Sequence, residues 1–571
     1  MDYISLPKRG LKAFLLLLAL AATGESAFAR ERSLPPSFQK SHFLRPLAQL
    51  AREVVAPPDL DALLAQEETR EGDGKAVAQQ FAVAQDLALD LAEAATWEEL
   101  PDGSRLGRLR LASTSALNLN LTFSHFELSG DAGLWIYSLD GAQTHGPFRG
   151  RDAKEGRLWT PVVVGEELVV ELLVPPGASA EVELESINHG YRVFGAVPLK
   201  QGACNVDVVC PEGNAYRDQI RAVGRYTLNG VLLCTGTLMN NTSLDRRPLF
   251  LSADHCNINT ANAPSMVVYW NYESPTCGAL SGGSLADNQA GATFRARFTP
   301  SDFALVELDE EPDDAFDVYY AGWDATGAVP QKVVAIHHPS LDEKAISIDN
   351  DPLVSDDIGR GGQTHWRVRD WDRGSTEGGS SGACIFDQTS KRCVGTLTGG
   401  LATCSNNLED YFGKFSLHWL GGGTNTSRLS NWLDPDGLLA AGAPLALDGI
   451  DPDNCIKNDT TACLANERFQ VRVKWRDSRG QTGYGHRKEI GSSSSVLFWF
   501  FDADNVEMLV KVLDACAINQ RFWVFGAAST DVEYTLEIID RQRNDVVKTY
   551  FNPLGTAAPA ITDIQAFATC N

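Results

Sequence analysis

Short apolar runs that alternate with polar residues fill most of this chain, and they predict a mainly β protein. Between Leu106 and Val193 the runs LGRLRLAS, ALNLNLTF, LVVELLV and AEVELESI are separated by Gly, Pro and Asp turns, which is typical of a β-sandwich. Residues 204 to about 450 contain further β-type runs, including SMVVYWNY, FALVEL, KVVAIHH and HWRVRDW. A last segment, from about 452 to 571, again predicts strands in FQVRVKW, SVLFWFF, RFWVFGA and YTLEIID.

Helical spacing of apolar residues is confined to two regions. Residues 30 to about 100 are rich in Ala, Leu, Glu and Gln, and the stretches 47–51 and 76–91 have helix-like spacing. Near the end of the central β region, Leu429, Trp432 and Leu433 fall at helical spacing before an Asp-Pro pair. We therefore expect a helical part to about residue 100, a sandwich over about 104–197 and one helix that closes the central region.

The N-terminal end has the composition of a secretory signal peptide. Lys8, Arg9 and Lys12 precede an apolar core at 13–22, and residues 27–29 (AFA) have the small-x-small form of a cleavage site. The apolar core is too short to span a bilayer, and no later segment reaches the ~20 apolar residues that a span requires. We therefore expect a signal peptide at 1–29 and an exported, secreted protein without a membrane span.

Length, charge and cysteine usage narrow the function classes. A chain of 571 residues is too long for one core, so several domains are expected. The formal net charge of −25 at pH 7 argues against nucleic-acid binding. None of the 12 cysteines precedes Cys204 and no CxxC pair occurs, so a zinc or thioredoxin-like site has little support. In an exported protein disulfides are the default, and we expect neither a metal nor a cofactor.

One glycine-rich run has the form of a serine nucleophile in an oxyanion-hole turn. In the run GGSSGA at 378–383, paired glycines allow a tight turn in which the N–H groups of Gly379 and Ser381 converge. Attack on a carbonyl places negative charge on its oxygen, and converging N–H donors stabilise that charge. Because runs of Gly and Ser are more often flexible turns, this interpretation requires a base and an orienting acid elsewhere.

His255 is the best candidate for the base. It follows an apolar strand and stands next to Cys256, which a disulfide would anchor. His337 and His338 are the rivals, but they precede a proline turn and have no anchoring cysteine. A lone histidine is more often structural than catalytic, so His255 in turn needs an orienting carboxylate.

Asp302 is the best candidate for that carboxylate. It stands at the mouth of the apolar strand FALVEL, where a side chain is expected to be half-buried, although a turn aspartate that caps the strand would look the same. Asp254, beside His255, is weaker, since adjacent side chains of an extended segment point to opposite faces. The order His255, Asp302, Ser381 is the one that chymotrypsin-type double β-barrels use.

The region from Cys204 to about Asp451 resembles the bacterial lysyl endopeptidases, the Achromobacter protease I group of the chymotrypsin-like fold. Matching stretches follow the family's order over about 250 residues: CNVDVVCPEG, IRAVGRY, CTGTLMNNT, ADHC, VVYWNYES, SDFALVEL, AGWD, AIHHP, TEGGSSG and RLSNWLDP. The resemblance implies a serine endopeptidase that cuts after lysine through an acyl-enzyme. It implies His255 as general base, Asp302 as its orienting acid and Ser381 as nucleophile, with Gly379 and Ser381 forming the oxyanion hole.

The resemblance also indicates where the specificity pocket lies. The position of the trypsin-type pocket acid, six residues before the nucleophile, holds Ser375, which is uncharged. The family's S1 carboxylate follows the nucleophile, in a segment like 409–414, so Asp410 is the expected S1 residue. Trp371 resembles the family's aromatic wall, and Thr398 replaces a family histidine near the pocket. Since a buried unpaired carboxylate is costly, the pocket should favour a cationic P1 side chain.

The resemblance further implies a disulfide framework and a mode of activation. The family's bridges map to Cys204–Cys404, Cys210–Cys277 and Cys234–Cys256; Cys384 and Cys393 suit a pair across a hairpin, and exclusion leaves Cys455–Cys463 and Cys516–Cys570 for the tail. The residue before the nucleophile is Ser380 where trypsin-like enzymes have aspartate, a feature that the family shares. Activation by an N-terminal ammonium that pairs with that aspartate is therefore not expected.

The flanking regions complete the predicted organisation. Residues 30–200 resemble a propeptide that assists folding and blocks the active site, and the Lys200–Gln201 junction ends in the residue after which the enzyme should cut. We expect autocatalytic maturation there, a protease domain over 201–451 and a β-rich accessory domain over 452–571. The expected partners are protein or peptide substrates and the propeptide itself, and the mature enzyme is expected to be a monomer. Two alternatives stay open: an endopeptidase that prefers Arg or another P1 residue, and a non-catalytic binding protein on a protease scaffold.

Overall fold

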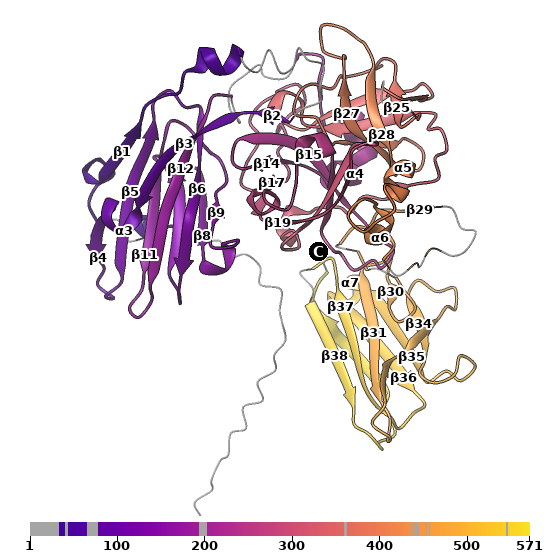
Figure 1. The fold of residues 1–571 in the computed structure, drawn as a ribbon. Helices are drawn as coiled ribbons and strands as arrows, with labels where there is room; N and C mark the ends of the chain where they lie inside the picture. Colours follow the sequence, from indigo (N-terminus) through magenta and orange to yellow (C-terminus); the bar gives the residue numbers. More distant parts are fainter. Residues whose placement is uncertain are drawn as a thin grey trace, which may run out of the picture.

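The computed structural model describes residues 33–39, 44–65, 78–192, 202–358, 362–435, 437, 439, 445–452, 454, 455, 457–543 and 546–570. The predicted signal peptide and the Lys200–Gln201 junction lie outside these residues. Figure 1 shows three β-rich bodies that follow one another along the sequence, an N-terminal, a central and a C-terminal one. In the described part of the chain, no helix combines the length and the apolar character that crossing a membrane requires. The mainly β fold predicted from the pattern is confirmed.

The N-terminal body is a sandwich of two sheets packed on an apolar core. The first sheet has the order β1-β5-β11-β7-β8, with β4 also on β5. Its strands are β1 (Ala51–Val55), β4 (Thr96–Glu99), β5 (Arg105–Ser113), β7 (Gly133–Ser138), β8 (Thr144–Phe148) and β11 (Glu167–Val174). The second has the order β10-β6-β12-β3, with β9 also on β6. Its strands are β3 (Ala82–Asp90), β6 (Asn118–Leu128), β9 (Leu158–Trp159), β10 (Val163–Val164) and β12 (Ala180–Gly190). Leucines, valines and phenylalanines that alternate along these strands fill the space between the sheets.

The predicted helical part up to about residue 100 is wrong. Strand β3 occupies most of the stretch 76–91, its residues alternate in burial, and it pairs antiparallel with β12. The sequence AVAQDLALD fits a period of two as well as a helical one, and pairing with a neighbouring strand decides between them. Around residue 47 only the three-residue helix η2 (Leu47–Gln49) forms. Strands β1, β3 and β4 therefore belong to the same sandwich as the residues after 104.

The central body consists of two mainly antiparallel sheets. The first has the order β18-β17-β14-β15-β16-β20-β19. Its strands are β14 (Val223–Leu228), β15 (Leu232–Met239), β16 (Leu249–Ser252), β17 (Val267–Tyr269), β18 (Asn288–Ala290), β19 (Ala292–Phe298) and β20 (Phe303–Leu308). The second has the order β13-β23-β22-β26-β27-β28-β25-β24, with β21 on β27 and on β29. Its strands are β13 (Val206–Asp207), β21 (Trp323–Asp324), β22 (Val333–His337), β23 (Ala345–Asp349), β24 (Val354–Asp356), β25 (His365–Val368), β26 (Cys384–Asp387), β27 (Cys393–Gly400), β28 (Asp410–Lys414) and β29 (Ala446–Leu447).

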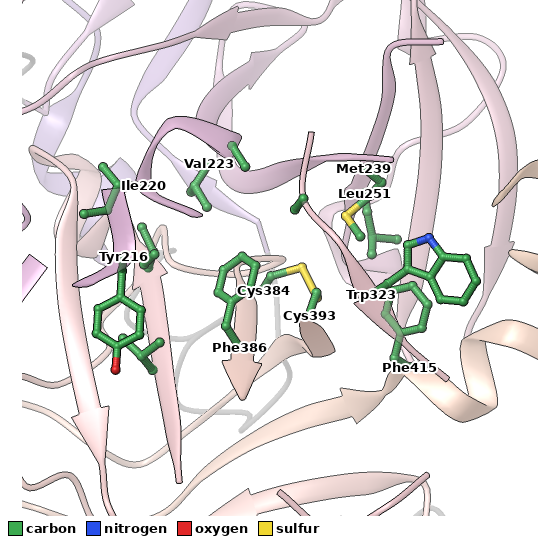
Figure 2. Close-up of a cluster of buried hydrophobic side chains, with 14 of the residues drawn as sticks. Tyr216, Ile220, Val223, Met239, Leu251, Trp323, Cys384, Phe386, Cys393 and Phe415 are labelled. Carbon is green, nitrogen blue, oxygen red and sulfur yellow. A yellow bond between two sulfur atoms is a disulfide. The ribbon is translucent and has the colours of Figure 1, made fainter. Parts of the chain in front are cut away.

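One apolar core joins the two central sheets. Val223 and Leu251 come from the first sheet, Phe386 comes from the second, and all three are fully buried in the same cluster (Figure 2). The Cys384–Cys393 disulfide lies within this cluster and ties β26 to β27. The shared core thus holds the two sheets against each other. This arrangement agrees with the two-barrel architecture that the resemblance implies.

Helices are short and few among the described residues. They are α1 (Pro36–Gln39), α3 (Leu91–Ala94), η3 (Gly150–Asp152), η4 (Pro211–Tyr216), α4 (Arg217–Ala222), η5 (Asp254–Cys256), η6 (Ala263–Ser265), η7 (Asp314–Phe316), η8 (Pro339–Leu341), α5 (Phe415–Leu420), α6 (Ser430–Leu433) and α7 (Cys516–Asn519), besides η2 and the helical residues 60–65. The expected closing helix is present as α6, where Leu429 and Leu433 are fully buried. A second helix, α5, was not expected.

The C-terminal body is built from strands, as the pattern predicts, and they form a second sandwich. One sheet has the order β30-β31-β37-β38 with β32 on β31, and the other has the order β33-β34-β35-β36-β39. The strands are β30 (Ala462–Leu464), β31 (Phe469–Arg476), β32 (Thr482–Tyr484), β33 (His486–Lys488), β34 (Ser495–Trp499), β35 (Met508–Ala515), β36 (Arg521–Ala528), β37 (Glu533–Asp540), β38 (Val546–Asn552) and β39 (Ile561–Phe567). Its core is separate from that of the central body, so the two form distinct domains.

All six disulfides are present with the expected pairing. They are Cys204–Cys404, Cys210–Cys277, Cys234–Cys256, Cys384–Cys393, Cys455–Cys463 and Cys516–Cys570. Four lie in the central domain and two in the C-terminal one. Bridges that close long loops restrict the unfolded chain most, so the Cys204–Cys404 bridge, with a separation of 200 residues, is expected to contribute most to stability.

Candidate active site

A buried His–Asp pair lies at the junction of the two central sheets. Helix η5 places His255 directly after β16, and the Cys234–Cys256 disulfide fixes that end to β15. Asp302 stands just before β20, the partner strand of β16. Its carboxylate accepts a hydrogen bond from the His255 backbone N–H at 2.9 Å, and its other oxygen lies 2.8 Å from His255 Nδ1. The two residues predicted from the sequence as base and acid are therefore in direct contact.

The environment of Asp302 keeps it ionised. The residue is 1 % exposed, and burial alone would raise its pKa. The attraction of His255 and the hydrogen bonds to the carboxylate outweigh burial and lower the pKa of Asp302 below its ordinary value. An ionised Asp302 holds the proton of His255 on Nδ1, which leaves Nε2 as an acceptor. Nε2 is buried, and within the described chain it has no hydrogen-bond partner.

The backbone of Asp302 is itself unusual. Its φ of 62° lies in the left-handed region, which a residue with a side chain seldom adopts. Such strain persists only where the surroundings enforce it, and it is common at functional sites. Asp254, the weaker candidate acid, is placed elsewhere: its carboxylate pairs with Arg297 Nε at 3.2 Å.

Polar side chains from the second sheet support the pair. Thr398 contributes to the lowered pKa of Asp302, and its hydroxyl lies 3.0 Å from His365 Nε2. His418 Nε2 lies 3.0 Å from the hydroxyl of Thr396, which is also on β27, two residues before Thr398. Burial lowers the pKa of His418 to about 3, so this histidine is neutral. Thr398, expected near the specificity pocket, thus lies near the His–Asp pair, with its hydroxyl on His365.

The turn around Ser381 lies between the two sheets. Thr235 of β15 donates its backbone N–H to Ser381 O at 2.9 Å, and its hydroxyl donates to Gly379 O at 2.9 Å. On the other side the Gly382 N–H donates to Leu397 O of β27 at 2.9 Å. Within the described residues, the N–H groups of Gly379 and Ser381 make no hydrogen bond. They are free to stabilise an oxyanion, as the sequence predicts.

Gly379 and Gly382 give this turn its shape. Their φ angles are 93° and 87°, which favour glycine. A Cβ on Gly382 would collide with Ser252 Oγ and Thr235 O, and it would lie 2.9 Å from Ala253 N, two residues before His255. The serine turn and the histidine segment are thus packed directly against each other. No side chain fits between them.

The turn provides a stability prediction with a matched control. We expect Gly382→Ala to lower the free energy of unfolding by about 1–3 kcal/mol more than Gly423→Ala, because backbone strain is common to both variants and only the Cβ added at Gly382 collides with its surroundings. Gly423 has nearly the same φ, 82°, but nothing lies within 4 Å of the position of an added Cβ. Chemical denaturation of both variants measures the difference. Equal losses would mean that the close contacts at Gly382 are not structural constraints.

The two rival histidines have structural roles. His337 is fully buried between the hydroxyls of Ser380, at 2.8 Å, and Ser347, at 2.9 Å, and burial lowers its pKa to about 3. It thus links Ser380, the residue before Ser381, to Ser347 of β23. His338 Nδ1 lies 2.9 Å from Asp342 O, and burial lowers the pKa of this histidine as well. Neither histidine is available as a base.

Glu377 links the start of the central domain to the same turn. Its carboxylate accepts hydrogen bonds from the Gly202 N–H at 3.0 Å, the Asn205 amide at 2.9 Å and the Ser340 hydroxyl at 3.0 Å. Its carbonyl accepts from the Ser380 N–H at 3.1 Å. Sequence reasoning gave Glu377 no role and treated His337 only as a rival base, because their hydrogen-bond partners come together only in the folded domain.

Asp410 provides a buried carboxylate on the second sheet, near the serine turn. It is 1 % exposed and begins β28, where it pairs with Gly400 of β27, three residues after Leu397. One carboxylate oxygen accepts hydrogen bonds from Trp371 Nε1 and Thr376 Oγ1, both at 2.7 Å. The other oxygen lies against Gly400, where any side chain would collide with it. Within the described chain no cation forms an ion pair with this carboxylate.

Burial raises the pKa of Asp410 to about 6, against the hydrogen bonds from Thr376 and Trp371, which lower it. A group with a raised acid pKa is partly neutral in mildly acidic solution and binds a cation only after losing its proton. Trp371, expected as an aromatic wall, is buried and serves as one of the donors that orient this carboxylate.

The raised pKa predicts a pH-dependent preference for cationic side chains. We expect the ratio of kcat/KM for a lysyl substrate to that for its norleucyl analogue to fall by up to about tenfold per pH unit below pH 6. Any effect of pH on the chemical step is common to both substrates and cancels in the ratio. A ratio that stays constant between pH 5 and 8 would exclude Asp410 as the group that pairs with the substrate.

Two family models match this chain. A family model described as the lysyl endopeptidase N-terminal domain matches residues 52–188, and one described as the lysyl endopeptidase C-terminal domain matches residues 200–413. A lysyl endopeptidase of Pseudomonas aeruginosa is 30 % identical over 358 residues, which cover 56 % of this chain and 75 % of that protein.

The solved structures that match part of this chain share little sequence with it. A Glu endopeptidase is 17 % identical, with a TM-score of 0.25, over 38 % of this chain and 93 % of that one. An HtrA-type protease in complex with a decapeptide is 12 % identical, with a TM-score of 0.27, over 61 % of this chain and 98 % of that one. By the family models and the Pseudomonas relative, the chain belongs to the lysyl endopeptidase family, and it is a serine endopeptidase.

Proposed function

We propose that this chain is the precursor of a secreted serine endopeptidase that hydrolyses peptide bonds on the carboxyl side of lysine. The observation that carries the proposal is the buried Asp410 carboxylate, which lacks a cationic partner in the described chain. Asp410 pairs with Gly400 of β27, three residues after Leu397, which contacts the Ser381 turn. The N-terminal signal-like segment and the six disulfides support export.

The proposed reaction gives each of three side chains one role. Ser381 Oγ attacks the carbonyl carbon of the substrate while His255 Nε2 takes its proton, and the C–O bond of a tetrahedral intermediate forms. Asp302 keeps His255 in the right tautomer and stabilises its protonated form. The N–H groups of Gly379 and Ser381 stabilise the oxyanion.

Collapse of the intermediate releases the leaving amine. His255 gives its proton to the nitrogen as the C–N bond breaks, and an acyl-enzyme remains on Ser381. Water then attacks the acyl-enzyme with the same histidine as base, which regenerates the serine. Every proton passes through His255 Nε2, the buried nitrogen that has no partner in the described chain.

Lysine specificity is proposed to come from Asp410. An ammonium group that enters the pocket would neutralise a carboxylate whose burial is otherwise unfavourable, so binding and charge pairing are coupled. The name of the Pseudomonas relative supports lysine over arginine. Digestion of an unrelated denatured protein, with mass spectrometry of the new C-termini, tests this. Cuts after lysine are expected, cuts after arginine alone would contradict the specificity, and no cuts would favour a non-catalytic protein.

Maturation is proposed to be autocatalytic at the Lys200–Gln201 bond. We expect the purified Ser381→Ala chain to keep its N-terminal domain indefinitely, and a trace of wild-type enzyme to release a chain that begins at Gln201. Intact-mass measurement of both samples over time checks this. Processing of the pure Ser381→Ala chain at Lys200 would show that the cleavage does not depend on Ser381.

A further inference from the structure

A short strand of the N-terminal domain lies on the edge of the central domain. Strand β2 (Gln79–Gln80) pairs antiparallel with β15, Gln80 opposite Leu232 and Gln79 opposite Leu233. In Figure 1 it extends from the N-terminal sandwich to the central body. The next residue, Phe81, donates its backbone N–H to Val231 O at 2.9 Å and is fully buried in a core that both domains share. The strand is therefore part of the folded structure of the whole chain.

The side chain of Gln79 reaches the serine turn. A Cβ on Gly378 would lie 2.6 Å from Gln79 Oε1 and 3.0 Å from its Cδ, so the carboxamide rests directly on the Gly378 backbone. Ala78 is buried in the same apolar cluster as Cys234 and Cys256, the disulfide next to His255. Gln80 differs, since its amide donates to Ala82 O within its own domain at 3.0 Å. The contact with the active-site region thus belongs to Ala78 and Gln79.

The position of β2 identifies the side of the site that it covers. The Ser381 turn is held between Thr235 of β15 and Leu397 of β27. Asp410, the proposed lysine-binding residue, begins β28 and pairs with Gly400 of β27. Strand β2 lies along β15, on the side of His255, which must protonate the leaving amine. The residues that follow the cut bond of a substrate have to leave on this side.

We propose that β2 is the inhibitory element of the N-terminal domain and that it blocks the leaving-group side of the active site. It adds a strand to the edge of β15 where the substrate residues after the cut bond would otherwise pair. The Asp410 pocket is not the blocked part. This proposal rests on the proposed function and adds to it which contact inhibits the precursor and from which side.

The rest of the domain contact is suited to a partner that is later released. Asn120 of β6 donates to Gly230 O at 2.9 Å, Lys154 pairs with Asp309 at 3.0 Å, and the Tyr269 hydroxyl accepts from the Val162 N–H at 2.9 Å. Polar groups of this kind can be hydrated again after separation, unlike a purely apolar core. Inhibition through β2 is therefore expected to be reversible once the Lys200–Gln201 bond is cut.

Binding of two labelled peptides to the Ser381→Ala chain tests the proposal. One peptide ends at its lysine, and the other continues for four residues beyond the same lysine. We expect the intact chain to bind the peptide that ends at lysine and to bind the extended peptide at least tenfold more weakly. After a trace of wild-type enzyme has cut Lys200 and the N-terminal domain has been removed, both peptides should bind with similar affinity.

Two variants of the intact Ser381→Ala chain assign the effect to β2. Gln79→Pro removes a backbone N–H and disturbs the pairing with β15, so it should raise the affinity for the extended peptide at least tenfold. Gln80→Ala is the matched control and should leave both affinities unchanged.

Three outcomes would overturn the proposal. Tight binding of the extended peptide to the intact chain would mean that β2 does not block, and exclusion of both peptides from the intact chain would place the block at the lysine pocket. An unchanged affinity for the extended peptide in Gln79→Pro would assign the block to another segment. Failure of both peptides to bind even the cleaved chain would contradict the proposed lysine specificity instead.

Discussion

Replacement of Ser381 by alanine is expected to lower kcat/KM for lysyl peptides by about 10⁴–10⁶-fold, the loss typical of removing a nucleophile that acts as one unit with its base. The turn provides the geometric reason. The N–H groups of Gly379 and Ser381 make no hydrogen bond within the described residues, and Gly382 packs against Ser252 and Ala253, just before His255. Without Oγ no acyl-enzyme forms, and only substrate binding and oxyanion stabilisation remain.

The measurement compares wild-type and Ser381→Ala proteins that were both processed at Lys200 by a trace of active enzyme. Ser405→Ala is the control, because among the described residues this exposed serine bonds only to Thr403, in its own loop. Its activity should equal that of the wild type. A Ser381→Ala enzyme that keeps more than about one hundredth of the activity would be incompatible with nucleophilic catalysis by this serine.

Asp410→Asn is expected to have the second-largest effect, a loss of about 10²–10⁴ in kcat/KM for lysyl substrates, equivalent to the ~3–5 kcal/mol that an unpaired buried charge costs. Asparagine keeps the shape of the side chain and can still accept a hydrogen bond from Trp371 or Thr376. What it removes is the negative charge, so a lysine ammonium would enter the pocket without a partner.

A matched control stands next to it in the chain. Glu409→Gln makes the same change of charge one residue away, on a side chain that is only partly buried, and should alter kcat/KM by less than about threefold. A norleucyl substrate should be cut equally well by wild type and Asp410→Asn. Unaltered lysine preference in Asp410→Asn would place the specificity group elsewhere.

The sequence allowed the main site residues to be predicted because each stands in a distinctive local context. Ser381 lies in a glycine turn, His255 between an apolar strand and a cysteine, and Asp302 at the start of an apolar strand. The supporting histidines have no such context. His418, for example, bonds Ser301, 117 residues away, and only the folded sheets bring the two together.

The fold was predicted less well where the two domains meet. Residues 82–90 were expected to be helical, yet they form β3, because pairing with β12 outweighs a weak local preference. In β6 the alternation of Leu with Asn predicts a solvent-exposed polar face. Asn118 and Asn120 are instead fully buried, and Asn120 bonds Gly230 of the central domain. Such a contact between domains leaves no periodic signal in the sequence.

The most direct test of the account is the detection of an acyl-enzyme on Ser381. Processed wild-type enzyme is mixed with a blocked lysyl ester, quenched with acid during turnover, digested with a second protease and analysed by mass spectrometry. The account predicts a lysyl adduct on the peptide that contains Ser381, its absence in Ser381→Ala and its strong reduction in Asp410→Asn. Turnover of the ester without any adduct on that peptide, or an equal adduct in Ser381→Ala, would contradict the account.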